Sequence, residues 1–139
     1  MAIGALLGEK HSCLHDYESF FWVLFWICIH FSGPNVKGRV VNKFEKWNYL
    51  DTEELATSKL GTVSDEDIFL EIVSQNFTSY HQPLVPWMNR LRRIVFPNGR
   101  LRKEPDKGLA ARMRKLLGEA QQDSNVLGEL GKERKISKS

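Results

Sequence analysis

The fold is decided by the stretch HDYESFFWVLFWICI, residues 15–29. Its last ten residues, Phe20–Ile29, are apolar without a polar interruption. A helix that is apolar on every side must be surrounded by protein or by lipid. Counted through Phe31, such a helix spans about 18 Å at roughly 1.5 Å per residue, whereas a bilayer core is about 30 Å thick. We therefore expect the central buried helix of a globular domain and no transmembrane segment.

The two ends of this helix carry the signals that are typical of helix termini. Asp16 is the expected N-cap, because its carboxylate can accept hydrogen bonds from the unpaired N–H groups of the first turn. Glu18 suits the positive end of the helix dipole. The breakers at 32–35, Ser-Gly-Pro-Asn, predict the end of the helix. The first fifteen residues are expected to form a short apolar turn of helix and then a polar loop.

Three amphipathic helices are expected around the apolar one. The first runs from Trp47 to Leu60 and stops at Gly61. The second is capped at Ser64, and its apolar stripe follows the helical 3, 4 spacing: Ile68, Phe69, Ile72, Val73 and Phe77. The third begins between Pro83 and Pro86 and is closed by Pro97-Asn98-Gly99; its stripe is Leu84, Trp87, Met88, Leu91, Ile94 and Val95. No alternating run predicts a strand, so the expected fold class is mainly α, with one buried apolar helix packed by amphipathic helices.

Charge divides the chain into an acidic body and a basic C-terminal part. Residues 1–89 carry a net charge of −5 and residues 90–139 carry +8. We expect one domain over residues 1–97 and a basic, largely disordered tail over 98–139, with a short helix near 107–118. The chain has two cysteines, one of them inside the apolar helix, which suggests a reducing compartment without disulfides. The expected location is intracellular, cytoplasmic or nuclear.

The sequence contains no strong motif for a phosphate-binding, metal-binding or nucleophilic site. The sequence holds no glycine-rich phosphate loop. His11, Cys13 and His15 stand at alternate positions, but a zinc site usually takes its four ligands from two separated pairs, which favours an ordinary polar loop here. Cys13 beside a histidine lacks a third group to orient the base. We therefore predict no catalytic residue, no cofactor-binding residue and no metal site.

A basic patch lies on the third amphipathic helix and on the segment that follows it. Its members are Arg90, Arg92, Arg93, Arg100, Arg102 and Lys103. Nucleic-acid phosphates attract such charges, but no recognised reading motif accompanies them, so the pattern does not favour a nucleic-acid partner. One interpretation is a non-catalytic helical interaction module that binds an acidic partner through this basic segment; a solvated tail explains the charges equally well.

Residues 15–28 closely resemble the fungal-type protein kinase-like family. The preceding MAIGALL, residues 1–7, looks like that family's segment at the end of the activation loop. Trp47, Ala56 and Lys59 fall where the family carries a Trp and an Ala-x-x-Lys. The resemblance covers roughly residues 1–97. It implies the C-terminal part of the kinase large lobe, with the apolar helix as the central helix of that lobe.

The resemblance also implies roles for single residues. Asp16, Glu18 and Trp26 would be structural anchors, with Asp16 matching the Asp that holds the backbone of the catalytic loop. Gly4 stands where a kinase usually has the Glu that ties the activation segment to the lobe. Losing that carboxylate would leave its basic partner unpaired.

The activity implied for the parent family is transfer of a phosphoryl group from ATP, with Mg, to protein Ser or Thr. This needs a Gly-rich loop, a strand Lys, a catalytic Asp and a metal-binding Asp, and the sequence contains none of these motifs. We expect the fragment to be inactive alone, with an N-terminal kinase half or an acidic protein as its partner. We also expect a marginally folded free chain. Full burial of one large apolar side chain contributes ~1.5–3 kcal/mol to stability. If ten such side chains are only partly covered, the domain loses on the order of 10 kcal/mol of that stability.

Overall fold

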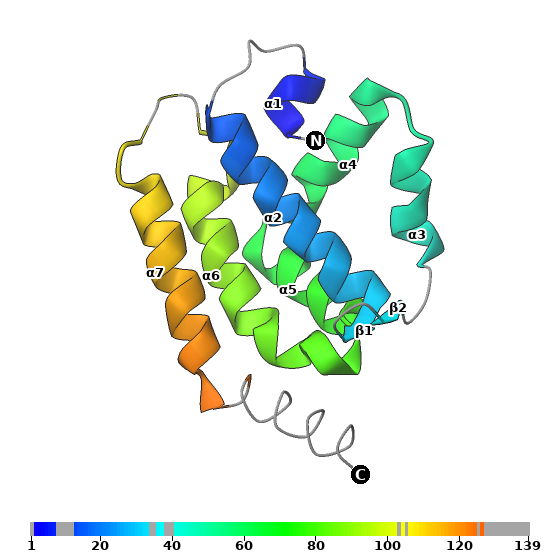
Figure 1. Ribbon diagram of the computed structural model, residues 1–139. Helices are drawn as coiled ribbons and strands as arrows, with labels where there is room; N and C mark the ends of the chain where they lie inside the picture. The colour runs from blue at the N-terminus through cyan, green and yellow to red at the C-terminus, as the bar shows by residue number, and fades with distance from the viewer. Residues whose placement is uncertain are drawn as a thin grey trace.

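The protein, described by a computed structural model, is built mainly from α-helices (Figure 1). The structure describes residues 2–7, 13–33, 36–37, 41–102, 104, 106–124 and 126. The predicted fold class, mainly α, is confirmed.

The elements follow one another along the chain in this order. The helices are α1 (Ile3–Leu6), α2 (Cys13–His30), α3 (Asn42–Glu45), α4 (Thr52–Val63), α5 (Glu66–Asn76), α6 (Val85–Val95) and α7 (Leu109–Gln122). Three 3-10 segments are η1 (Lys46–Asn48), η2 (Ser79–Leu84) and η3 (Pro97–Gly99). A short antiparallel hairpin pairs β1 (Phe31–Gly33) with β2 (Val36–Lys37). This hairpin was not predicted, because strands of three and two residues are too short to produce an alternating pattern.

Helix α2 runs through the middle of the molecule, with α6 and α7 on one side and α1 and α4 on the other (Figure 1). One of its faces lies in the core, where Phe21 and Phe25 are completely buried. The opposite face is open: Phe20, Val23 and Ile27 are 45%, 58% and 38% exposed. This open face agrees with the incomplete covering of the helix that we expect for the free chain. Among the described residues, helices pack against only part of its circumference.

The start of α2 also differs from the prediction. The helix begins at Cys13, so Asp16 lies exposed within its first turn and is not the N-cap. No breaker stands at positions 13–15, and Leu14 packs against the core, which favours one more turn. Cys13 and His15 are therefore helical rather than part of a polar loop, and His11 lies outside the described residues. The acidic side chain of Asp16 still suits the positive end of the helix dipole.

Helix α4 begins later and ends later than predicted. Asp51 is its N-cap and accepts a hydrogen bond from the Glu54 N–H at 2.8 Å. The predicted start, Trp47, lies in η1 instead, and Gly61 is inside the helix rather than at its end. A glycine within a helix costs only about 1 kcal/mol relative to alanine, which the packing of neighbouring turns can offset.

Helix α5 is capped by Asp65, one residue after the predicted cap. The Asp65 carboxylate accepts a hydrogen bond from the Ile68 N–H at 3.0 Å, and Ser64 is the C-cap of α4. The predicted apolar stripe faces the core through Phe69 and Val73, both completely buried.

Helix α7 packs against α6 and joins the core (Figure 1). Leu109, Met113 and Leu116 belong to the same hydrophobic cluster as the residues of α2. The helix expected near 107–118 is therefore present and continues to Gln122, so its last four residues fall where we expected disorder. Residues 127–139 lie outside the described residues, and the division of the chain at residue 97 stays a prediction.

Candidate functional site

A buried carboxylate joins α1 to α2. Glu18 projects from α2 and is only 6% exposed. Its Oε2 atom accepts a hydrogen bond from the backbone N–H of Ile3 at 2.5 Å and another from the Trp22 indole Nε1–H at 2.9 Å. One oxygen therefore holds the N-terminal helix against the central one.

A buried lysine from α4 completes this cluster. Lys59 is 5% exposed, and its Nζ lies 5.1 Å from the ring centroid of Trp22 and 5.8 Å from that of Trp47. An ammonium at such distances from an indole face is attracted by the ring quadrupole. We call Glu18, Trp22, Trp47 and Lys59 the Glu18–Lys59 cluster.

The two charged groups of the cluster stabilise each other. Burial raises the pKa of Glu18, while its hydrogen bonds and the nearby Lys59 lower it. Burial lowers the pKa of Lys59, and the Glu18 carboxylate opposes that shift. Burying one charge without a partner is costly, so the two ions are tolerated in the core because they occur together. The cluster thereby links α1, α2 and α4.

An open pocket of about 270 Å³ borders the cluster between α2, η1 and α4. It is lined by Trp22, Val23, Trp26, Ile27, Trp47, Asn48, Leu55 and Lys59. Trp26 is fixed by His30 one turn further on: the ring centroids are 4.1 Å apart, and His30 Nδ1–H donates to the Trp26 carbonyl at 3.1 Å. The pocket is therefore mostly apolar, with a buried ammonium in its wall.

The three anchors implied by the resemblance have different surroundings. Glu18 is the centre of the buried cluster, Trp26 lines the neighbouring pocket, and Asp16 is exposed on the first turn of α2. Their anchoring role stays a prediction. The sequence places Lys59 in the Ala-x-x-Lys pattern but does not predict it as a site residue. In the structure, Ala56 and Lys59 are both buried on the same face of α4.

Two basic residues of α6, Arg92 and Arg93, make polar contacts with other helices. Arg92 is 4% exposed; its guanidinium donates to the Val63 carbonyl at 3.1 Å and to Asn89 Oδ1 at 3.0 Å. Arg93 forms an ion pair with Glu66, whose pKa is lowered by hydrogen bonds from Asn89 and Arg93. These contacts tie α6 to the ends of α4 and α5.

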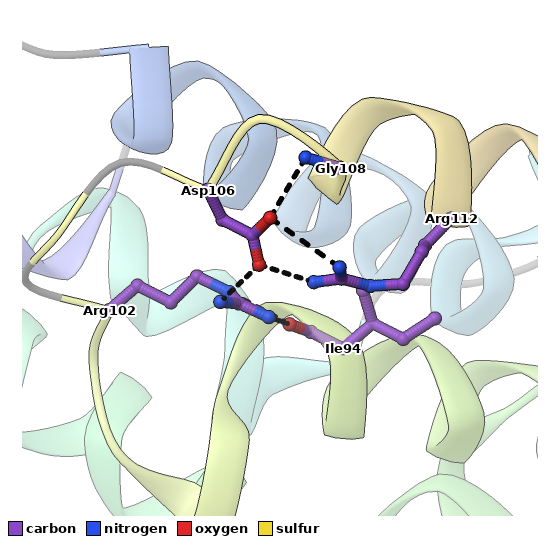
Figure 2. Close-up of polar contacts among 5 residues, drawn as sticks. All are labelled: Ile94, Arg102, Asp106, Gly108 and Arg112. Carbon is purple, nitrogen blue, oxygen red and sulfur yellow. Dashed lines mark hydrogen bonds and ion pairs between the residues drawn. The ribbon is translucent and has the colours of Figure 1, made fainter.

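Arg102 is likewise a structural contact (Figure 2). Asp106 accepts hydrogen bonds from Arg102 at 3.0 Å, from Arg112 at 2.6 Å and from the Gly108 N–H at 2.9 Å. Arg102 also donates to the carbonyl of Ile94 at 2.6 Å. The turn before α7 is thus pinned to α6.

The described residues of the predicted basic patch differ in their exposure and in their contacts. Arg92 is buried, Arg102 is half-buried in the Asp106 contacts, and Arg90 lies over the Trp87 ring at 4.7 Å. Arg100 is exposed, and Lys103 lies outside the described residues. Most of these charges have structural partners that the sequence pattern did not reveal.

The described part of the chain was expected to hold no metal site and no catalytic thiol, and this expectation stays a prediction. No three His, Cys, Asp or Glu side chains gather there in an arrangement that could hold a metal ion. Burial raises the pKa of the Cys28 thiol to about 12, so Cys28 is protonated near neutral pH. In the described ranges, no helix combines the length and hydropathy that a membrane crossing requires.

The comparison with protein families finds a match at the N-terminal segment, which contains Glu18. Residues 1–28 match the model of the fungal protein kinase family. The matched segment contains Glu18 and both of its hydrogen-bond donors, Ile3 and Trp22. It spans 28 of the 139 residues and ends before Lys59. No curated protein and no solved structure matches the chain.

Proposed function

We propose that this chain is the C-terminal helical part of a fungal-type protein kinase-like domain and that it transfers no phosphoryl group by itself. The observation that carries the proposal is the position of the family match. It falls on α1 and most of α2, and these are the two helices that the buried Glu18 carboxylate holds together.

The expected inactivity follows from what phosphoryl transfer requires. Catalysis depends on positioning ATP and Mg and on stabilising the charge of the transferred phosphoryl group. The motifs that supply these groups in kinases are absent from the sequence. In this proposal ATP, Mg and the protein Ser or Thr substrate belong to the parent domain. The buried Cys28 thiol is compatible with a reducing intracellular compartment.

The open face of α2 supports the proposal independently. Phe20, Val23 and Ile27 form an exposed apolar stripe on the most apolar helix of the chain. Contiguous exposed apolar patches mark surfaces that meet another protein element. An N-terminal kinase half that covers this stripe would complete the burial that the sequence of α2 predicts.

The test measures nucleotide binding and phosphoryl transfer. The purified chain is titrated with Mg·ATP by calorimetry and incubated with γ-labelled ATP and a Ser/Thr protein substrate; no saturable heat and no labelling are expected. The chain is then fused behind the N-terminal half of a fungal protein kinase, and labelling is expected to appear. The same fusion carrying Glu18→Lys is the control and should remain inactive. Saturable ATP binding by the chain alone would overturn the expected inactivity, and a fusion that folds without activity would count against the kinase assignment.

A further inference from the structure

The tryptophan-lined pocket beside the Glu18–Lys59 cluster has the composition of a small-molecule site. Such sites are concave and mostly apolar, with a few polar groups that orient the ligand. We propose that this pocket binds a small aromatic carboxylate. Its ring would lie among Trp22, Trp26 and Trp47, and its carboxylate would face Lys59. This inference goes beyond the proposed function, and it concerns the free chain, because Val23 and Ile27 belong both to the pocket lining and to the open face of α2.

The residues that line the pocket favour a small aromatic ligand. Trp22, Trp26 and Trp47 supply flat faces, and Leu55 adds an aliphatic wall. Aromatic rings pair favourably by offset stacking or edge-to-face contact. The volume of about 270 Å³ suits a one- or two-ring molecule and is too small for a nucleotide.

The positive charge of Lys59 favours a ligand with a single negative charge. Among the described residues that line the pocket, Lys59 is the one that carries a charge, and its ammonium lies against the rings of Trp22 and Trp47. Glu18, whose negative charge acts on Lys59, is not among the residues that line the pocket. A ligand carboxylate would share the Lys59 ammonium with Glu18, whereas a phosphate dianion would bring a larger excess of negative charge into an apolar site.

A cationic ligand does not fit the same pocket. Aromatic cages hold a cation over the faces of their rings. Here that position over Trp22 and Trp47 is already taken by the Lys59 ammonium. A second cation would be repelled by it. The Asn48 side chain adds a hydrogen-bonding group at the pocket.

The experiment compares two ligands of equal shape and different charge. Binding of 1-naphthoate and of neutral 1-naphthamide to the full chain is measured by calorimetry, and the indole N–H signals are followed by NMR. We expect naphthoate to bind about tenfold more tightly than the amide, or better. The signals of Trp22, Trp26 and Trp47 should shift, while that of Trp87, which is not part of this pocket, should stay in place.

Two variants test separately the charge of Lys59 and the free volume of the pocket. Lys59→Met keeps the length of the side chain and should reduce naphthoate affinity to that of the amide. Leu55→Trp fills the pocket but leaves the ammonium and Glu18 unchanged, so it should abolish binding even if Lys59→Met fails to fold. Arg93→Met, which removes a cation outside the pocket, should bind naphthoate like the parent chain. Equal affinity for the two ligands, no binding, or unchanged binding by Leu55→Trp would overturn the proposal. None of these outcomes alters the kinase-fusion result.

Discussion

The replacement Glu18→Gln tests whether the buried carboxylate holds α1, α2 and α4 together. Glutamine has nearly the same shape and keeps one oxygen that can accept from the Ile3 N–H and the Trp22 indole. It removes the negative charge that faces the buried Lys59 ammonium. Removing one partner of a directly contacting buried ion pair costs about 3–5 kcal/mol, and the Glu18 carboxylate acts on Lys59 only through its charge. Because the attraction is weaker than in a direct pair and the hydrogen bonds partly survive, we expect the free energy of unfolding to fall by about 2 kcal/mol, a sizeable part of the ~5–15 kcal/mol of a typical domain.

Urea denaturation followed by far-UV circular dichroism measures this change. The exposed Glu53→Gln is the matched control and should cost less than about 1 kcal/mol, since it removes only a favourable contact with the dipole of α4.

The double variant Glu18→Gln/Lys59→Met removes both charges. It should be less destabilised than the sum of the two single variants, because the remaining partner is no longer a lone buried ion. A loss of under about 1 kcal/mol for Glu18→Gln, or strict additivity in the double variant, would refute the reasoning.

Three further predictions concern other parts of the fold. Gly99→Ala should destabilise the protein by at least about 1 kcal/mol in urea, since Gly99 has φ +74° and an added Cβ would lie 2.2 Å from the Ser64 carbonyl oxygen; Gly61→Ala, with nothing within 4 Å, should not destabilise it. Asp106 has its pKa lowered by Arg112 and the Gly108 N–H, so its stabilisation is present above the usual value of 3.8 and is lost as the pH falls through the folded-state value. Asp106→Asn should therefore flatten the acid side of a plot of urea midpoint against pH, and an unchanged slope would contradict this. Cys28, with a pKa of about 12, should resist iodoacetamide at neutral pH until urea is added, as peptide mass mapping would show; rapid labelling of the native protein would contradict its burial.

The sequence predicted helices better than it predicted their surroundings. The apolar stripes of α5 and α6 were visible because polar residues separate their members at helical spacing. In α2, by contrast, all residues from Phe20 to Ile29 are apolar, so the pattern could not show that one face stays open. The caps were misplaced by a residue or more, because several adjacent polar residues can each fill the same role.

The contacts of the site could not be predicted from spacing. Glu18 and Lys59 are 41 positions apart, and only the packing of α4 on the N-terminal part of the chain brings their charges close. Arg92 looked like part of a surface patch, yet it is buried because the Val63 carbonyl and Asn89 provide acceptors for its guanidinium. Both cases depend on tertiary partners that a local pattern does not contain.

The association state of the purified chain tests the central claim most directly, namely that the open face of α2 is built to be covered. Sedimentation velocity over a range of concentrations, together with a thermal melt, measures it. The account predicts concentration-dependent association and a broad transition. The variant Phe20→Ser/Val23→Ser/Ile27→Ser should keep the helical circular dichroism spectrum and remain monomeric. A parent chain that is monomeric at every concentration and melts in one sharp cooperative transition would contradict the account.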